Sequence, residues 1–187
     1  MAPFTEDELV ETIRKLLSGH PPGVRLGPGD DAALVEPSPH LGVPTTDMLV
    51  EGVHFELGMT SARDLGYKAM AVNESDVAAM GGSPRYALVS IGLPPATEGG
   101  WVVELYGGLR EAADEHAVAV VGGDVSRSDR AVITVTVVGE VSEFGAVTRG
   151  GARPGDAVVV TGSLGAAAGG LELIRGSERG TRRAAGT

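Results

Sequence analysis

The sequence predicts an α/β (α+β) fold in which helices cover one mixed β-sheet. Segments rich in apolar and β-branched residues alternate along the chain with segments of helical periodicity. Gly and Pro occupy 29 and 11 of the 187 positions, so the elements are expected to be short and joined by tight turns. Aromatic residues make up only 4%, so Val, Ala, Leu and Ile are expected to build the core.

The first element is a helix that follows a capping box. Thr5 is the expected N-cap, and Glu8 stands three residues further on. Apolar residues then recur at helical spacing, namely Leu9, Ile13, Leu16 and Leu17. Pro21-Pro22 is expected to end the helix, and a Gly/Pro-rich loop over 23–31 and an apolar run over 32–35 follow.

Strands and helices alternate after this loop. Four strands are expected over 43–55, 86–93, 117–121 and 131–141. Two helices are expected, one from the N-cap Ser61 to Met80 and one marked by Trp101, Leu105, Leu109 and Ala112. Gly122-Gly123-Asp124 is expected to form a turn. A short apolar run over 158–161 precedes a Gly-rich segment and the start of a further helix near Leu164.

Charge and composition exclude several functional classes. The formal net charge of −10 argues against a nucleic-acid partner, because binding a phosphate backbone needs a basic surface. The absence of Cys excludes disulfides, thiolate metal sites and a Cys nucleophile. No apolar run approaches the roughly 20 residues that span a bilayer, and the acidic first helix is unlike a signal peptide. A cytoplasmic protein without a membrane segment is therefore expected.

Carboxylates at four places in the sequence are candidates for a functional site. They are Asp30-Asp31 in a Gly-rich loop, Asp47 after Thr45-Thr46, Asp76 in a helix, and Asp124 behind two glycines at a strand end. Asp76 is expected to face inward, since Val72 and Met80, four residues before and after it, are apolar. An unpaired carboxylate against a core costs several kcal/mol, so a cation, either an Arg or a metal, is expected beside it.

These acids, together with Thr hydroxyls, predict hard oxygen coordination, which suits Mg²⁺ rather than zinc or copper. Phosphate-loop, GxGxxG and protein-kinase signatures are absent, so a nucleotide would be bound by a less common fold. His54 and Arg149 are candidate contacts to a substrate phosphate or a nucleotide, with a satisfied side chain and a solvated loop charge as the alternatives. Tyr106 is either an exposed ring or a nucleotide-stacking ring, and Lys68 is compatible with an ordinary solvated residue.

Six segments together carry a resemblance, in order and in spacing, up to about residue 175. They are GPGDDAAL (27–34), TTDMLVEGVHF (45–55), YKAMAVNESDVAAMGGSP (67–84), GGDVSRS (122–128), TRGGARPGD (148–156) and VTGSLG (160–165). The chain thereby resembles the bacterial thiamine-monophosphate kinases, in the superfamily of aminoimidazole ribonucleotide synthetase and selenophosphate synthetase. The resemblance implies a mixed sheet covered by helices in an N-terminal ATP- and magnesium-binding domain over 1–145. It also implies the start of a C-terminal domain over 146–175, and the Arg-rich 176–187 are expected to form a disordered tail.

The resemblance implies ATP-dependent phosphorylation of thiamine monophosphate to thiamine diphosphate, within thiamine diphosphate biosynthesis, by a homodimer that forms through its sheets. The magnesium ligands implied are Asp31, Thr45, Thr46, Asp47, Asp76 and Asp124. The substrate contact implied is His54, and the ATP contacts implied are Tyr106, Gly123, Asp124 and Arg149. No side chain is assigned a catalytic role.

The chain departs from the family pattern in three ways. Glu74 stands where the family has an apolar residue, a change expected to be compatible with the surface, and Val125 replaces a common Thr. The family also extends well beyond residue 187, with further metal-binding acids and much of the thiamine pocket. A truncated copy that binds magnesium-nucleotide weakly and has only traces of kinase activity is therefore expected. The alternatives are a non-catalytic dimerising fragment and a related ATP- and magnesium-dependent enzyme with another small substrate, against which His54 in EGVHF argues.

Overall fold

The computed structural model describes residues 5–19, 21–141 and 143–185 of the chain. They belong to two compact units, Met1–Thr148 and Arg149–Thr187, and each unit is described by itself. The predicted domain boundary at 145/146 lies three residues before the division between these units.

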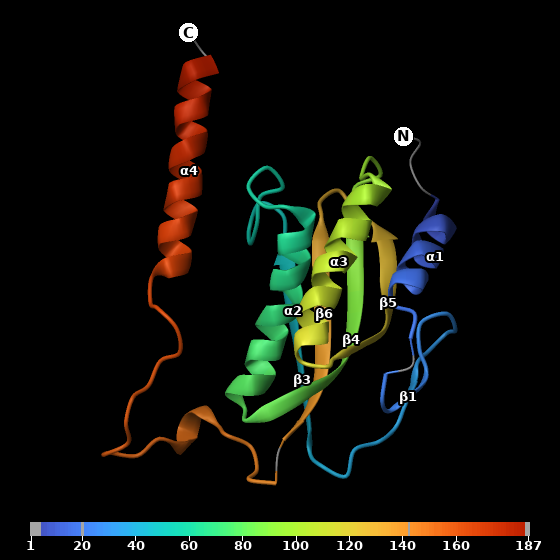
Figure 1. Ribbon diagram of the computed structural model, residues 1–187, viewed down its shortest axis with the longest axis vertical. Coiled ribbons are helices and arrows are strands. Elements are labelled where there is room, and N and C mark those ends of the chain that lie inside the picture. The colour runs from blue at the N-terminus through green and yellow to red at the C-terminus, as the bar shows by residue number, and fades with distance from the viewer. Residues whose placement is uncertain (1–4, 20, 142, 186–187) are drawn as a thin grey trace. The chain divides into compact units, whose positions relative to one another are not determined.

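The first unit is built on a four-stranded mixed sheet (Figure 1). Its strands are β3 (Gly42–Val50), β4 (Gly82–Leu93), β5 (Ala119–Arg127) and β6 (Val132–Val141). Their order is β3-β6-β4-β5, in which β6 is antiparallel to both of its neighbours and β5 is parallel to β4. The edge strands of this sheet are therefore β3 and β5. A separate antiparallel pair joins β1 (Val24–Leu26) to β2 (Leu34–Val35).

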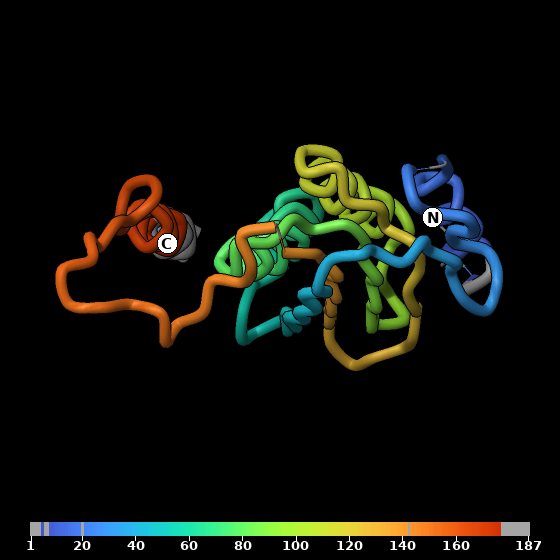
Figure 2. Tube along the Cα trace, turned by 90° about the horizontal axis from the view of Figure 1, so that it is seen from below, coloured from blue at the N-terminus to red at the C-terminus, as the bar shows by residue number. Residues whose placement is uncertain are grey.

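Helices cover one face of the four-stranded sheet. The described residues of this unit form the helices α1 (Glu6–Leu16), α2 (Ala62–Ala79) and α3 (Gly99–Glu115). Figures 1 and 2 show α2 and α3 along the same side of the strands. Strand residues on that side are buried, as Val89, Ile133 and Val137 illustrate, because they pack against the two helices. The predicted fold class, a mixed sheet covered by helices, is confirmed.

Two glycines allow α2 and α3 to pack with their backbones in close contact. A Cβ atom on Gly66 would lie 1.9 Å from the carbonyl oxygen of Leu105, and one on Gly108 would lie 1.8 Å from that of Arg63. Any larger residue at either position would force the helices apart. This crossing sets the rotation of α2 about its own axis and therefore decides which of its side chains are buried.

Several predicted boundaries hold, and others shift. The capping box of α1 is confirmed, with the backbone N–H of Glu8 donating to Thr5 Oγ1 at 3.3 Å. The turn predicted at 122–124 is wrong, because β5 continues through it to Arg127. The glycine there serves close strand packing, since a Cβ on Gly123 would lie 1.8 Å from the carbonyl oxygen of Val89. Strand β3 ends at Val50, and a turn over 51–55 follows it.

The second unit contains η1 (Arg149–Gly151) and α4 (Ala166–Ala185). The apolar run Val158–Val160 is exposed and lies outside any strand, although its composition favours one. Helix α4 continues through 176–185, which differs from the disordered tail expected there, because the Ala and Arg residues of this segment are good helix formers. Residues 186–187 lie outside the described part of the chain. Among the described residues, no helix is both long enough and apolar enough to cross a membrane.

Candidate functional site

The edge strand β3 and helix α2 run side by side and together form a pocket. Thr45 Oγ1 donates a hydrogen bond to Asp76 Oδ2 at 3.0 Å, which joins the start of β3 to the end of α2. Asp47 lies two residues after Thr45, so its side chain is on the same face of the strand, toward α2. The pocket, named here the β3–α2 pocket, is lined by Asp47, Tyr67, Lys68, Ala71, Val72, Ser75 and Asp76.

Helix α2 lines this pocket with two rows of residues at four-residue spacing. One row is Tyr67, Ala71 and Ser75, and the other is Lys68, Val72 and Asp76. The small side chains of Ala71 and Ser75 leave the middle of the pocket open, with a volume of about 480 Å³. Two carboxylates and a hydroxyl thus meet near one end of the pocket, and an ammonium group lies near the other.

His54 lies in the turn that follows β3. Its ring is oriented by the backbone N–H of Val50, which donates to His54 Nδ1 at 3.1 Å. The backbone N–H of His54 donates in turn to the Val50 carbonyl at 2.9 Å. The Nζ of Lys68 then donates to the His54 carbonyl oxygen at 3.0 Å, which ties the turn to α2. His54 is therefore an exposed side chain held at the Lys68 end of the β3–α2 pocket.

The expectation that Asp76 faces inward is wrong. Asp76 is exposed, and the buried face of α2 carries Ala69, Met70, Asn73 and Val77 instead. The close packing at Gly66 explains the difference, because it rotates α2 relative to the position that Val72 and Met80 suggest. In the part of the chain that the structure describes, Asp76 has no ion pair, and Thr45 is its hydrogen-bond donor. Folding therefore places no cation beside Asp76, which leaves it available to a bound one.

The buried acid of α2 is Glu74, so the expectation that this residue suits the surface is also wrong. Its side chain is 5% exposed, and Oε2 lies 3.2 Å from Nδ1 of His116 at the C-cap of α3. Burial raises the pKa of the Glu74 carboxyl, the charge of Glu115 adds to this, and His116 offsets part of it. This pair could not be predicted from local patterns, because its members are 42 positions apart along the chain.

Thr46 and Asp124 lie on the other face of the sheet, away from the β3–α2 pocket. Thr46 Oγ1 donates to the carbonyl of Val135 at 3.2 Å and accepts from Thr136 Oγ1 at 3.0 Å. Asp124 accepts from Ser126 Oγ at 2.9 Å. Strands β3 and β5 are three strand spacings apart, about 14 Å, so these two side chains do not share one ion with Asp76 inside this unit.

The remaining predicted metal ligand, Asp31, lies in the loop between β1 and β2. Its backbone N–H donates to Asp30 Oδ1 at 2.8 Å, and the residue is exposed. The β1–β2 pair is anchored near β4, where Tyr86 Oη donates to the Gly23 carbonyl at 3.3 Å. Of the predicted ligands, the structure therefore brings together Thr45, Asp47 and Asp76, and it keeps Asp31, Thr46 and Asp124 apart from them.

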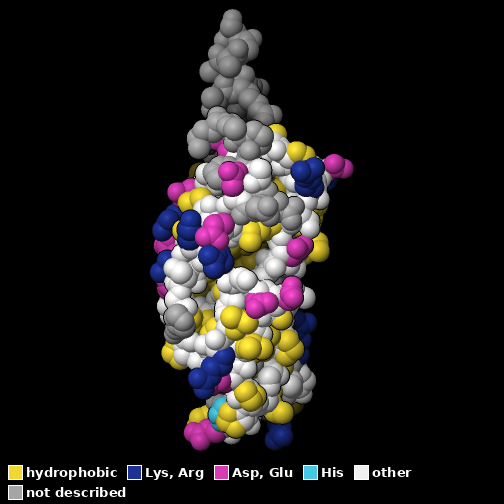
Figure 3. All heavy atoms as spheres, turned by 90° about the vertical axis from the view of Figure 1, so that its right-hand side faces the viewer, with side chains coloured by type: hydrophobic (Ala, Val, Ile, Leu, Met, Phe, Trp, Pro, Cys, Tyr) yellow, Lys and Arg dark blue, Asp and Glu magenta, His cyan; other side chains and the backbone are white. Residues whose placement is uncertain are grey.

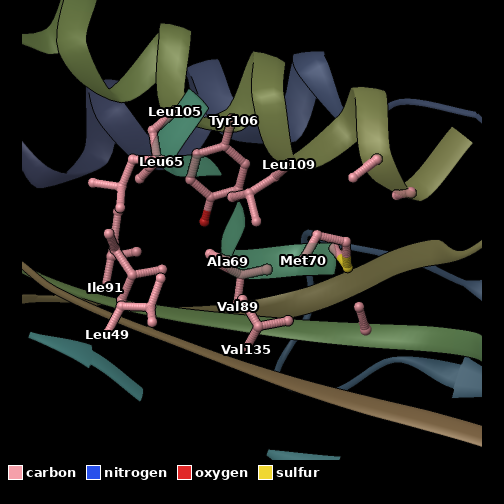
Figure 4. Close-up of a cluster of buried hydrophobic side chains, with 14 of the residues drawn as sticks. Leu49, Leu65, Ala69, Met70, Val89, Ile91, Leu105, Tyr106, Leu109 and Val135 are labelled. Carbon is pink, nitrogen blue, oxygen red and sulfur yellow. The ribbon is translucent and has the colours of Figure 1, made fainter. Parts of the chain in front are cut away.

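Tyr106, a predicted ATP contact, is part of the core. It is 3% exposed and packs among Leu65, Leu105 and Leu109 between α3 and the sheet (Figure 4). Burial raises the pKa of its hydroxyl. The prediction of an exposed ring is wrong, because the ring faces the sheet and its burial leaves no open face for stacking on a nucleotide. Arg149, another predicted contact, is exposed in η1 of the second unit.

The donor set of the β3–α2 pocket fits Mg²⁺. Carboxylate and hydroxyl oxygens are the ligands this ion prefers, and Mg²⁺ usually keeps several waters and phosphate oxygens beside one or two carboxylates. Asp47 and Asp76 supply those two carboxylates, with Thr45 beside them. Among the described residues, no three His, Cys, Asp or Glu side chains come together as a metal cage. The pocket therefore suits an ion that arrives with its own phosphate ligands rather than a fully protein-bound metal.

Charges of both signs are spread over the surface elsewhere. Figure 3 shows acidic, basic and apolar side chains interspersed over one side of the molecule. A second pocket, mainly apolar, lies at the start of α3, with Leu57, Pro94 and Trp101 among its lining residues and a volume of about 320 Å³. Lys68, for which the sequence suggested an ordinary solvated residue, lines the β3–α2 pocket, and its spacing of four and eight residues to Val72 and Asp76 is the signal that places it there.

Comparison with protein families places residues 29–141 in the family described as AIR synthase related protein, N-terminal domain. The thiamine-monophosphate kinase of Bacillus subtilis is 43% identical over 157 residues, which cover 83% of this chain and 48% of that protein. The enzyme of the same name from Aquifex aeolicus is 45% identical over 146 residues, or 78% of this chain and 47% of that protein. The chain thus spans about half the length of the curated relatives it matches.

The chain also aligns with about half of the length of related solved structures. The crystal structure of thiamine-monophosphate kinase from Stenotrophomonas maltophilia aligns with a TM-score of 0.79 and 38% identity, covering 90% of this chain and 52% of that one. The complex of AaThiL with AMPPCP and TMP aligns with a TM-score of 0.71 and 41% identity, covering 92% and 53%. The hydrogenase maturation protein HypE in complex with ATP aligns with a TM-score of 0.62 and 26% identity, covering 76% and 42%.

Proposed function

The chain belongs to the family of AIR synthase related proteins through its N-terminal domain, and from this premise we propose that it carries the nucleotide- and magnesium-binding part of a kinase. The proposed reaction is the phosphorylation of thiamine monophosphate by ATP to thiamine diphosphate. Relatives named thiamine-monophosphate kinase, and a related structure holding AMPPCP and TMP, support this proposal.

One observation carries the proposal. Thr45 and Asp76 are joined by a 3.0 Å hydrogen bond across β3 and α2, and Asp47 lines the same pocket. These three side chains would hold Mg²⁺. When bound, the ion supplies neutralisation of the negative charge that otherwise keeps two phosphate groups apart. The side chains themselves need only hold their oxygens on one side of the pocket, because phosphoryl transfer depends on positioning more than on a strong base.

In the proposed reaction the phosphoryl group passes directly from ATP to thiamine monophosphate, without a protein nucleophile. The bond between the γ-phosphorus of ATP and its β–γ bridging oxygen breaks, and ADP leaves with the electron pair. A new bond forms between that phosphorus and a phosphate oxygen of thiamine monophosphate. A proton on that oxygen, where one is present, passes to solvent. His54 would contact the acceptor from its fixed turn beside the pocket.

The face of the sheet without helices supports a homodimer. Its exposed apolar side chains include Met48 at 54%, Leu88 at 44% and Val138 at 39%. We propose that a second copy covers this face around a two-fold axis. The predicted ligand roles of Thr46 and Asp124 then require ions at that interface, since both side chains lie on this face.

The other predicted contacts remain part of the proposal. Gly123 and Arg149 would contact ATP, and Asp31 would join the metal ligands, while Tyr106 belongs to the core. We also propose the division into a domain over 1–145 and the start of another over 146–175. A cytoplasmic location is proposed because that compartment supplies ATP.

A thermal-shift series beside a kinase assay tests the proposed function. Mg²⁺ and a non-hydrolysable ATP analogue together should raise the unfolding temperature more than either alone, because only their complex uses both the metal ligands and the phosphates. Thiamine diphosphate should form above the enzyme-free level with thiamine monophosphate and ATP, and should disappear in Asp76→Asn. No joint shift and no product would contradict the proposal.

A second candidate is a related ATP-dependent enzyme with another small substrate. The alignment with HypE in complex with ATP favours it, since that structure shares the fold at 26% identity. A joint shift with Mg²⁺ and the analogue, but no formation of thiamine diphosphate, would favour this candidate. A stable dimer with neither response would favour a non-catalytic dimerising fragment.

A further inference from the structure

A single lysine lies in the β3–α2 pocket, opposite the carboxylates. The chain has 15 Lys and Arg residues, and only Lys15 and Lys68 are lysines. Elsewhere the chain uses arginine as its cation. Lysine at this position therefore suggests a need for its compact ammonium group, which is a point charge with three rotatable donors rather than a planar fork.

The geometry gives Lys68 two neighbours of different kinds. One of its three N–H donors is used in the 3.0 Å bond to the His54 carbonyl oxygen. The side chain is exposed and also lines the pocket with Asp47 and Asp76. Lys68 thus anchors the turn that carries His54 while its charge faces the space where a ligand would lie.

Position along α2 separates the two ends of the pocket. Lys68 and Asp76 are eight residues apart on one helix face, or about 12 Å along the axis. Asp47 of β3 also lines this pocket. A ligand that spans the pocket would therefore meet carboxylates that favour a metal near one end and an ammonium that favours an anion near the other.

Resting on the proposed function, we propose that Lys68 binds a phosphate group of the ligand in the β3–α2 pocket, which in the proposed reaction is the phosphate of thiamine monophosphate. His54 stands in the turn that Lys68 anchors, so the acceptor's phosphate and the remainder of the molecule would be held by neighbouring groups. The same ammonium counteracts the repulsion between this phosphate and Asp47 and Asp76.

Calorimetric titration of the 187-residue chain, with Mg²⁺ and a non-hydrolysable ATP analogue present, tests this assignment. Thiamine monophosphate and thiamine are compared on the wild type, Lys68→Ala, Lys68→Arg and the control Lys15→Ala, whose lysine is a solvated residue of α1. Lys68→Ala should weaken thiamine monophosphate about ten- to a hundredfold, the range for a hydrogen bond between charged groups. It should leave thiamine unchanged. Lys68→Arg should recover part of the loss, and Lys15→Ala should show none.

The comparison of the two ligands separates a phosphate contact from a structural role. An equal loss for thiamine and thiamine monophosphate in Lys68→Ala would mean that the residue only supports the turn, and would overturn the inference. An unchanged affinity for both would overturn it as well.

Magnesium pyrophosphate, titrated without nucleotide, separates this inference from the proposed function. If thiamine monophosphate does not bind the wild type but Lys68→Ala weakens pyrophosphate tenfold or more, the proposed substrate is wrong and the phosphate assignment stands. If pyrophosphate binding is absent or insensitive to Lys68→Ala while thiamine monophosphate also fails to bind, the inference is overturned.

Discussion

Replacing the buried Glu74 by leucine is expected to stabilise the protein. The carboxyl group is 5% exposed between α2 and α3, and its counter-charge is a histidine that is itself 54% exposed. Burial raises the pKa of this carboxyl, which means that the ionised form is the one the folded state disfavours. Glu74→Leu removes the buried charge and leaves His116 in contact with water, where it needs no partner.

The expected gain in stability of Glu74→Leu can be estimated from other buried ion pairs. Replacing a buried ion pair by apolar groups is neutral or stabilising by about 1–4 kcal/mol. Because His116 is half exposed, water already screens the charges of this pair. The lower part of that range therefore applies, about 1–2 kcal/mol. For a chain of this length this corresponds to a rise in the unfolding temperature of about 2–8 °C.

The effect must also depend on pH in a defined direction. The folded-state pKa of Glu74 lies above its ordinary value of 4.5. The stability that its bound proton contributes is therefore complete below about pH 4.5 and is lost as the pH rises through the folded-state pKa. The advantage of Glu74→Leu should be small at about pH 4.5 and larger at pH 7.

Urea denaturation of the wild type, Glu74→Leu, His116→Ala and the double variant, at both pH values, measures these terms. His116→Ala should cost about 1–2 kcal/mol, because it leaves the buried Glu74 carboxyl without its partner, and nothing in the Glu74→Leu background. A destabilised Glu74→Leu at pH 7, or an advantage that does not grow with pH, would refute the reasoning.

Two further predictions concern packing and assembly. Gly108→Ala should destabilise the protein by about 1–3 kcal/mol in urea denaturation, because its methyl group would lie 1.8 Å from the Arg63 carbonyl. The neighbouring Gly107→Ala meets only a flexible arginine end at 3.2 Å and should be neutral or stabilising. A Gly108→Ala variant as stable as the wild type would contradict the close helix contact. Leu88→Glu should convert the proposed dimer to a folded monomer in light scattering at about tens of micromolar, and a wild type that is already monomeric there would contradict the proposed interface.

Local signals in the sequence predicted the elements well. Ser61 caps α2 as predicted, with the backbone N–H of Asp64 donating to Ser61 Oγ at 3.0 Å. The helix also ends where predicted, with Met80 as its C-cap. The apolar spacing of α3 likewise predicted its buried face, including Leu105 and Leu109. These features depend on residues within one turn of each other, which is why a single sequence reveals them.

Features set by contacts between distant segments could not be predicted in this way. The rotation of α2 depends on Gly66 meeting the backbone of Leu105 on α3. That contact exposes Asp76 and buries Glu74, the reverse of what the apolar neighbours Val72 and Met80 suggest. The strand path through Gly123 similarly depends on its partner strand β4.

Only part of the candidate site could be predicted, because contacts between distant segments also decide which of its residues meet. Thr45, Asp47 and Asp76 meet because β3 and α2 lie side by side. Thr46 lies on the opposite face because neighbouring strand residues point to opposite sides, so a run of three polar residues cannot all bind one ion from a regular strand. The motifs predict which residues are candidate metal ligands. The face of the sheet on which each side chain lies then decides which of them can bind the same ion.

The most direct test of the β3–α2 pocket as a magnesium-nucleotide site is calorimetric titration with an ATP analogue at a series of Mg²⁺ concentrations. The wild type, Asp76→Asn and the control Asp114→Asn are compared, since Asp114 is an exposed acid of α3 outside the pocket. Asp76→Asn keeps the shape of the side chain and removes its charge. We expect magnesium-dependent nucleotide affinity to fall by more than tenfold in Asp76→Asn, about 1.4 kcal/mol or more, and to stay unchanged in Asp114→Asn. Equal magnesium-dependent affinity in the wild type and Asp76→Asn would contradict the assignment of the pocket.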